Sequence, residues 1–181
     1  MRIETERLLL RPWEERDVLP FAAMCADPEV MEFFAETLDV DGTRALIARL
    51  EDRRARGGFG MLAADEKATG AFVGVIGLQQ VPYEAAFTPA VEVGWRLARA
   101  YWRKGLASEG ARACLAHGFS AGLPEIVAVA YVDNLRSHAV MERIGMRRDA
   151  AADFDHPALP GHRLARHGLW RIGRADWEAA G

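Results

Sequence analysis

Apolar residues in the first half of the chain fall into short runs rich in valine, isoleucine and phenylalanine, a pattern typical of strands. The expected strands are residues 7–13, 59–64, 70–80 and 90–97. The second and third are joined by the turn-rich segment 65–69, which predicts a hairpin. In the fourth strand the apolar positions alternate with Glu92, Gly94 and Arg96, so these three residues share the opposite face.

Helical patterns fill much of residues 15–56. The acidic residues after Pro12 suit the first turn of a helix, whose positive end favours carboxylates. Asp27 followed by Pro28 predicts a second helix start, with proline at the first helical position. A charged helix is expected from about Thr43, closed by the glycine pair 57–58.

In the second half, a long helix is expected from Leu106, because small and apolar residues recur there with helical spacing. The positions on this stripe are Leu106, Ala107, Gly110, Ala111, Cys114, Leu115, Gly118 and Phe119. A strand at 125–131, a helix at 134–144 and a strand at 167–172 follow. Hairpins in the first half of the chain and strand-helix-strand crossovers in the second half predict an α/β (α+β) fold, in which helices pack on a mixed sheet.

Length and composition limit the number of domains, the role of the cysteines and the location of the protein. A length of 181 residues suits a single domain spanning 1–181, with its core at about 7–173. Only two cysteines are present, Cys25 and Cys114, and their spacing indicates neither metal nor redox work. No apolar run is long enough to span a bilayer, and the charged first residues lack a secretory core, so a cytoplasmic protein without a membrane partner is expected.

The net charge of the chain narrows the classes of binding partner to expect. A net charge of −3 without a long basic run provides no electrostatic footprint for nucleic acid, although a local basic patch can hold a small anion. Asp155, His156, His162 and His167 lie in or near a Pro/Gly-rich segment whose spacing fits no common metal motif, so no metal is expected. We expect the loop 154–162 to border a pocket instead. Phe33, Phe34 and Glu36 are expected either to line its other side or, for the two phenylalanines, to pack in the core.

The segment 101–107 carries an arginine, a lysine and a glycine directly before the long helix. Unpaired backbone N–H groups at a helix start, together with the positive end of its dipole, form a site for a pyrophosphate. The alternative is that Gly105 only permits a turn while Arg103 and Lys104 are solvated. Neither a Walker loop nor a GxGxxG motif is present.

A second informative segment begins the helix at 134–144. Asn134 is a good helix N-cap, and Ser137 falls in the first turn, so capping alone accounts for both residues. The segment ends with Ile144, Gly145 and Met146.

Together these segments resemble the GNAT superfamily of N-acetyltransferases. The resemblance rests on the loop 103–107 after a Glu-Val-Gly-Trp strand, the Asn134 to Ser137 helix start and the Ile-Gly-Met ending, all in the same order. The opening Thr5-Glu6-Arg7-Leu8, followed by Leu9-Leu10-Arg11-Pro12, is similar to the branch of ribosomal-protein alanine acetyltransferases (RimJ/RimL-type). The match covers nearly the whole chain.

The resemblance implies a mostly antiparallel sheet of about six or seven strands, flanked by about four helices. Acetyl-coenzyme A (acetyl-CoA) would be the co-substrate, bound where the strands at 90–97 and 125–131 splay apart. The pyrophosphate would lie on the loop before the long helix, and the pantetheine arm along the strand backbone and the next helix start. The implied cofactor-binding residues are Val93, Trp95, Arg103, Lys104, Gly105, Leu106, Ala107 and Asn134. Trp102 departs from the family, which prefers glutamine or arginine there.

The chemistry requires a base, because a primary amine is mostly protonated at neutral pH. Glu92 is the candidate: it shares a strand face with Gly94, where a missing side chain leaves room for a ligand. A structural pairing of Glu92 with an arginine is the alternative. Backbone N–H groups of the splayed strand would stabilise the oxyanion.

The leaving thiolate would gain a proton. Many superfamily members supply a tyrosine seven residues after the helix asparagine, but Met141 stands there in this chain. Ser137 resembles the serine of the alanine-acetylating branch and is our candidate, with Tyr131 and Tyr101 as further possibilities.

The expected acceptor is an amine-bearing small molecule or a peptide N-terminus, and the expected assembly a monomer or homodimer. Two other functions stay open: a CoA-binding regulatory module without turnover, and a nucleotide-binding module that uses the Gly105 loop.

Overall fold

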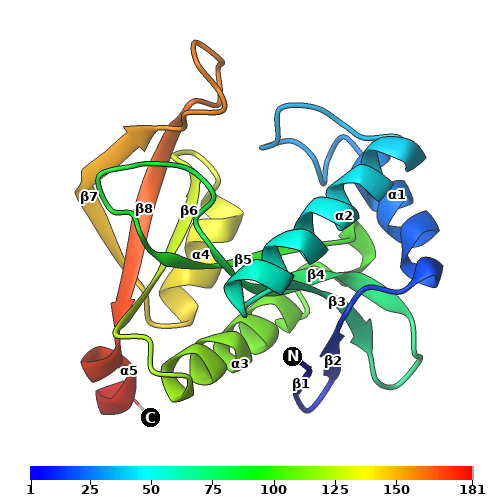
Figure 1. Ribbon diagram of the computed structural model, residues 1–181, viewed down its shortest axis with the longest axis horizontal. Coiled ribbons are helices and arrows are strands. Elements are labelled where there is room, and N and C mark those ends of the chain that lie inside the picture. Colours follow the sequence, from blue (N-terminus) through cyan, green and yellow to red (C-terminus); the bar gives the residue numbers. More distant parts are fainter. Residues whose placement is uncertain (181) are drawn as a thin grey trace.

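One eight-stranded sheet runs through the computed structural model, which describes residues 1–180 (Figure 1). The strand order is β1-β2-β3-β4-β5-β6-β8-β7, and only the β5/β6 pair is parallel. The strands are β1 (Ile3–Glu4), β2 (Leu8–Arg11), β3 (Met61–Glu66), β4 (Phe72–Gln80), β5 (Val91–Leu97), β6 (Glu125–Tyr131), β7 (Arg147–Asp155) and β8 (Arg166–Gly173). The mixed, mostly antiparallel sheet predicted from the sequence is confirmed.

The α-helices are α1 (Val18–Ala26), α2 (Val40–Gly57), α3 (Leu106–Ser120), α4 (Leu135–Arg143) and α5 (Arg174–Ala180), with two short 3₁₀ turns, η1 (Glu15–Asp17) and η2 (Arg99–Tyr101). Sequence patterns missed β1, β7 and α5. β1 has only two residues, and β7 reads Arg-Arg-Asp-Ala-Ala-Ala-Asp-Phe-Asp, which lacks the β-branched residues that identify strands.

The segment between α1 and α2 corrects one expectation. Asp27 does not begin a helix: it ends α1, and its side chain accepts a hydrogen bond from the Glu29 N–H at 2.9 Å. This local bond replaces the helical one, and residues 28–33 form turns. The next helix, α2, begins at Val40 rather than Thr43, because Asp39 caps it by accepting from the Gly42 N–H. The glycine pair ends it, as expected: Gly57 is its last residue, and Gly58 follows as the C-cap with a φ of 75°.

Two apolar clusters lie on opposite faces of the sheet. On one face, α3 packs on β4 and β5 with its predicted stripe, including Leu115 and Phe119. The helix lies so close that a Cβ on Gly110 would be 2.5 Å from Ile76. On the other face, α1 and α2 cover β3 and β4 around Phe21 and Val75. β5 therefore turns Val93 and Leu97 toward α3, and Glu92, Gly94 and Arg96 toward the α1/α2 side.

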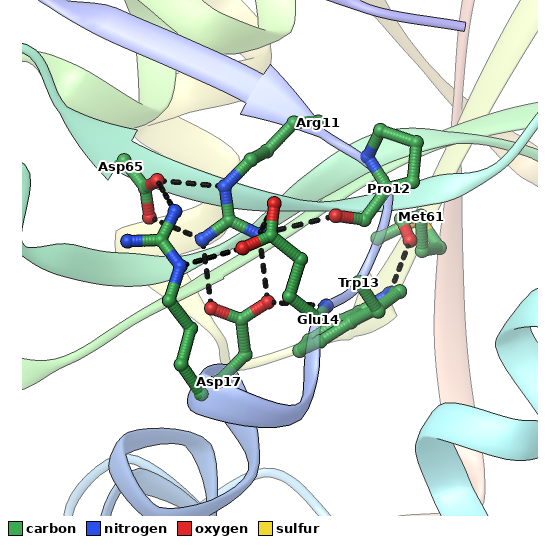
Figure 2. Close-up of polar contacts among 8 residues, drawn as sticks. Arg11, Pro12, Trp13, Glu14, Asp17, Met61 and Asp65 are labelled. Carbon is green, nitrogen blue, oxygen red and sulfur yellow. Dashed lines mark hydrogen bonds and ion pairs between the residues drawn. The ribbon is translucent and has the colours of Figure 1, made fainter.

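A buried ion cluster ties β2 to β3 and to the start of α1 (Figure 2). Arg11 on β2 donates two hydrogen bonds to Asp65 on β3, at 2.7 and 2.9 Å, and two to Asp17 at the start of α1, at 2.7 and 2.8 Å. All three side chains are buried. Hydrogen bonding to Asp17 is the main cause that raises the pKa of Arg11, so the guanidinium stays charged. The cluster fixes the start of α1 against the sheet.

No helix within residues 1–180 combines the length and the apolar character needed to cross a membrane.

Candidate active site

The sheet parts at its one parallel junction. β5 and β6 are in register at a single pair, Glu92 with Val127, and beyond that pair toward Leu97 and Tyr131 they make no further pairing. The main-chain edge of β5 facing β6 is therefore left open. The splay predicted for these two strands is confirmed.

A cavity of about 560 Å³ occupies the space beside the parted strands. It is large enough for a small molecule or the end of a peptide, whose pockets measure roughly 300–1,000 Å³. Five predicted site residues line it, namely Glu92, Val93, Trp95, Asn134 and Ser137. Strand β5 and the start of α4, which are far apart in the sequence, thus meet at one cavity.

Glu92 lies at the fork between the strands, on the face covered by α2. Its carboxylate accepts a 2.6 Å hydrogen bond from the Gln79 side chain on β4. Part of Glu92 opens to the cavity, yet burial raises its pKa; the bond from Gln79 and the charge of Arg53 oppose that rise. No arginine forms an ion pair with it among residues 1–180, so the alternative of a structural Glu–Arg pair is not what the structure shows.

The space expected beside Gly94 is partly filled. A Cβ built on Gly94 would lie 3.2 Å from the methyl carbon of Met61, which also lines the cavity. Gly94 therefore makes room for a neighbouring core side chain as well as for a ligand.

The start of α4 contributes a cap and a hydroxyl. The Asn134 side chain accepts a hydrogen bond from the Ser137 N–H at 3.1 Å, so it does cap the helix. This bond uses the amide oxygen and leaves the amide N–H₂ group without a partner in the described chain. The Ser137 hydroxyl, partly exposed, likewise makes no hydrogen bond there and borders the cavity. Met141, one turn further, is 2% exposed and offers no proton.

The loop before α3 lies outside this cavity. Arg103 and Gly105 both adopt positive φ, 59° and 78°, a conformation that turns successive N–H groups to one side. Arg103, Lys104 and Gly105 are exposed, Ala107 is partly exposed and Leu106 is buried in the core. Neither cation forms an ion pair within residues 1–180; Lys104 lies 5.2 Å from the Tyr101 ring.

This loop fits a diphosphate. The described chain provides no hydrogen-bond acceptor for the N–H groups of residues 103–108, apart from bonds internal to elements. Unpaired N–H donors at a helix start, with two free cations beside them, are the donor set that an anion requires.

The opening Thr5-Glu6-Arg7 has a structural role that the sequence did not indicate. Glu109 in the first turn of α3 accepts from the Thr5 hydroxyl at 2.6 Å, from the Arg7 N–H at 2.8 Å and from Arg7 Nε at 2.6 Å. Arg7 Nη1 also donates to the Lys104 carbonyl at 2.9 Å. The N-terminal residues therefore hold the loop and the helix start in place.

The departure at Trp102 also has a physical account. Its indole N–H donates to the Leu97 carbonyl at 2.7 Å, closing the end of β5, and the Arg136 guanidinium lies 4.6 Å from its ring. Arg136 in turn pairs with Glu32. Trp102 thus packs between the end of β5 and α4 instead of offering a polar side chain to a ligand.

Several cavity residues were not predicted as site residues from the sequence, namely Arg53, Gln79, Tyr83, Arg96 and His167. They lie on different elements, and no local motif groups them. Phe33 and Phe34 line the cavity, as expected in one of the two alternatives, but Glu36 does not. The expected loop 154–162 is partly strand: Phe154 and Asp155 end β7, and His156, Ala158 and Leu159 reach the cavity.

The histidines pack on one another. The rings of His156 and His167 are 5.0 Å apart, and burial lowers the pKa of both. Within residues 1–180 no three potential ligands gather in a way that would hold a metal ion.

Comparison with known proteins identifies the class of protein that this site belongs to. The family described as "Acetyltransferase (GNAT) domain" matches residues 7–147. Because this match spans more than half of the chain, the protein belongs to the GNAT family of acetyltransferases. The expected family and enzyme class, an N-acetyltransferase, are thereby confirmed.

Individual proteins are also similar to this chain in sequence or in structure. The uncharacterized protein YkkB of Bacillus subtilis is 34% identical over 148 residues, covering 80% of this chain and 84% of that protein. A crystal structure of a GNAT-family acetyltransferase from Bacillus anthracis is 27% identical with a TM-score of 0.78, covering 96% of this chain and 98% of that one. RimJ of Mycobacterium smegmatis, solved in complex with CoA-disulfide, is 18% identical with a TM-score of 0.79 and covers 97% and 88% of the two chains. At this identity the RimJ likeness concerns the fold alone.

Proposed function

We propose that the protein transfers an acetyl group from acetyl-CoA to a primary amine by direct attack of the amine on the thioester. The observation that carries this proposal is Glu92: a poorly solvated carboxylate at the fork of two parted strands, open to a cavity and without an ion-pair partner among residues 1–180. A base in this place can take the proton that a neutral-pH amine must lose before it attacks.

The cofactor side of the proposal uses the loop before α3. Arg103, Lys104 and the N–H groups through Ala107 would hold the diphosphate. The open edge of β5 at Val93 and Trp95 would pair with the pantetheine arm, and the free amide of Asn134 would face it. Bound acetyl-CoA supplies the activated acetyl group. The chain's own part is to orient the thioester between β5 and β6, where β5 N–H groups can donate hydrogen bonds to the developing oxyanion.

A panel of amine acceptors, with acetyl-CoA and detection of the released thiol, tests the proposed function. Thiol release that depends on an amine would support it. Binding of acetyl-CoA without release for any amine would instead favour a CoA-binding module without turnover, the second candidate, which Met141 at the position of the usual tyrosine favours.

The diphosphate assignment predicts a specific loss. Replacing Arg103 and Lys104 together by serine should weaken acetyl-CoA binding by roughly tenfold to a hundredfold, because each cation makes charge-assisted contacts with the phosphates. Binding of acetyl-pantetheine, which lacks the diphosphate, should stay unchanged. Calorimetry with both thioesters measures the difference.

Arg56→Ser, on the exposed surface of α2, is the matched control and should leave both affinities as they are. Equal weakening of the two thioesters by the double variant would show that the loop does not hold the diphosphate.

Ser137 is proposed to give a proton to the leaving thiolate. A thiol with a pKa of about 8.5 needs only modest help as a leaving group, so Ser137→Ala should lower kcat by roughly threefold to tenfold without changing acetyl-CoA affinity. Steady-state kinetics measures this, with Ser120→Ala at the far end of α3 as control. An unchanged kcat would remove Ser137 from the mechanism and make Tyr131, which also lines the cavity, the next residue to vary.

A further inference from the structure

Arg96 is a charged side chain on the same face of β5 as Glu92, and it has no charged partner among the residues that the structure describes. Its Nη1 contacts only two sulfur atoms, Cys25 Sγ and Met31 Sδ, each at 3.4 Å. Its Nε is fully enclosed and has no hydrogen-bond partner. Sulfur is a weak acceptor, so most of the five N–H donors of this guanidinium are unsatisfied by the described residues.

Two aromatic rings lie near the guanidinium. The guanidinium carbon lies 3.8 Å from the centre of the Phe34 ring and 5.9 Å from that of Phe21. These faces stabilise a cation, but they accept no in-plane hydrogen bonds. Burial lowers the pKa of Arg96 from its ordinary value, with the Cys25 thiol opposing the change, yet an arginine stays charged at physiological pH.

Arg11 provides a comparison within the same chain. It is buried too, but two carboxylates accept four of its hydrogen bonds. Structural arginines in protein interiors are normally paired in this way. Arg96 borders the cavity and lacks such a pair, so its pairing group is expected to arrive from the cavity.

The charges that line the cavity also indicate that the bound molecule carries an anionic group. The carboxylate and guanidinium side chains that line the cavity are Glu92, Arg53 and Arg96, and neither arginine forms an ion pair in the described part of the chain. His156 and His167 add no charge near neutral pH, because burial lowers the pKa of each. Two guanidinium groups therefore face one carboxylate, so the lining is net positive in either protonation state of Glu92, which favours an anionic group on the molecule that fills the cavity.

The two charged ends of the cavity are separated along β5. At the Glu92 end of the cavity, two enclosed polar atoms have no hydrogen-bond partner among the described residues: the Gln79 side-chain oxygen and the Tyr83 hydroxyl. Both are suited to accept a hydrogen bond from an amine. Arg96 stands four residues away, roughly 13 Å along a strand. The amine end and the cationic end thus lie at different positions on one face.

We infer that the acceptor carries a carboxylate that pairs with Arg96 while its amine lies at Glu92. This inference rests on the proposed function and narrows its substrate class to amines with an acidic group several bonds away. A short peptide with an acidic side chain near its N-terminus and an ω-amino acid both meet this description.

Matched acceptor pairs test the inference. One arm compares alanyl-aspartate amide with alanyl-asparagine amide, and the other compares ω-amino acids of increasing length with their amides. The carboxylate member should have a kcat/KM roughly tenfold to a hundredfold higher, because hydrogen bonds to ionised groups are the strong ones. Arg96→Gln should bring the ratio near one, chiefly through KM, and Arg96→Lys should keep part of it. The two arms distinguish a peptide acceptor from a small molecule.

Arg56→Gln is the surface control and should leave the ratio of kcat/KM between carboxylate and amide acceptors unchanged. Arg53→Gln measures how much the second cavity cation contributes to that ratio. Equal kcat/KM within every pair, or a preference that survives in Arg96→Gln, would overturn the inference. Calorimetry with the N-acetylated member of each pair provides a readout that needs no turnover. Tighter binding of the carboxylate members to the wild type than to Arg96→Gln, without thiol release from any amine, would sustain the inference and reject the proposed function; equal binding would reject the inference.

Discussion

Replacing Glu92 by glutamine should lower kcat by roughly 10²- to 10⁴-fold, the range that a positioned general base contributes. Acetyl-CoA affinity should stay the same, because the diphosphate is assigned to the loop before α3. Glutamine keeps the shape of the side chain and can still accept the hydrogen bond from Gln79. Thiol-release kinetics with calorimetry of acetyl-CoA binding measures both quantities.

The same variant has a signature in the pH profile. A base works only when ionised, so kcat/KM should rise with pH through the pKa of Glu92, which burial places above the ordinary glutamate value. Arg53 opposes this shift, and Tyr83 faces the same carboxylate. Two acceptors whose amines differ in pKa separate the titration of the amine from that of Glu92. In the plot of kcat/KM against pH, the limb that moves with the acceptor belongs to the amine, and the limb that stays fixed belongs to Glu92. Glu92→Gln should remove the fixed limb.

Folding provides the control for this variant. A carboxylate whose pKa is raised in the folded state stabilises the fold below its unfolded pKa, and this stability is lost as pH rises through the folded pKa. The Glu92→Gln variant avoids that loss, so it should be at least as resistant to denaturant as the wild type near neutral pH. Glu36→Gln, outside the cavity, should leave kcat and the profile unchanged. A fixed limb that persists in Glu92→Gln would exclude Glu92 as the base.

The second large effect is expected at Arg11. Arg11→Met should lower the free energy of unfolding by about 3–5 kcal/mol, because Asp17 would stay buried without a cation and Asp65 would keep only its 3.0 Å pair with the half-exposed Arg16. Urea denaturation followed by circular dichroism measures the change. Arg56→Gln, which breaks an exposed pair with Asp52, should change the unfolding free energy little.

A double variant tests the cause of the loss at Arg11. Adding Asp17→Asn to Arg11→Met removes the carboxylate that is left without a cation and should recover part of the lost stability, while Asp65 keeps its pair with Arg16. If Arg11→Met alone unfolds at the wild-type urea concentration, the cluster does not contribute to stability as the geometry indicates.

Local signals along the chain determined much of the architecture. Alternation placed the strand at 90–97, observed at Val91–Leu97, and an apolar stripe placed the helix from Leu106, because each pattern reflects the period of its own element. The order of weak motifs identified the family. Sequence patterns failed where residues lack a strong preference, as in the alanine-rich β7, or where a side chain competes with the helix, as at Asp27.

The composition of the cavity was decided only by tertiary structure. Glu92 was predicted from its strand face beside Gly94 and Ser137 from the family resemblance, but no local signal marks Gln79, Tyr83 or Arg96 as site residues, since their roles depend on which atoms remain unpaired after packing. The sequence presents Arg11 and Arg96 as two arginines on strands. Only the fold shows that one is enclosed by Asp17 and Asp65 while the other has no carboxylate, because pairing depends on distances between segments far apart in the chain.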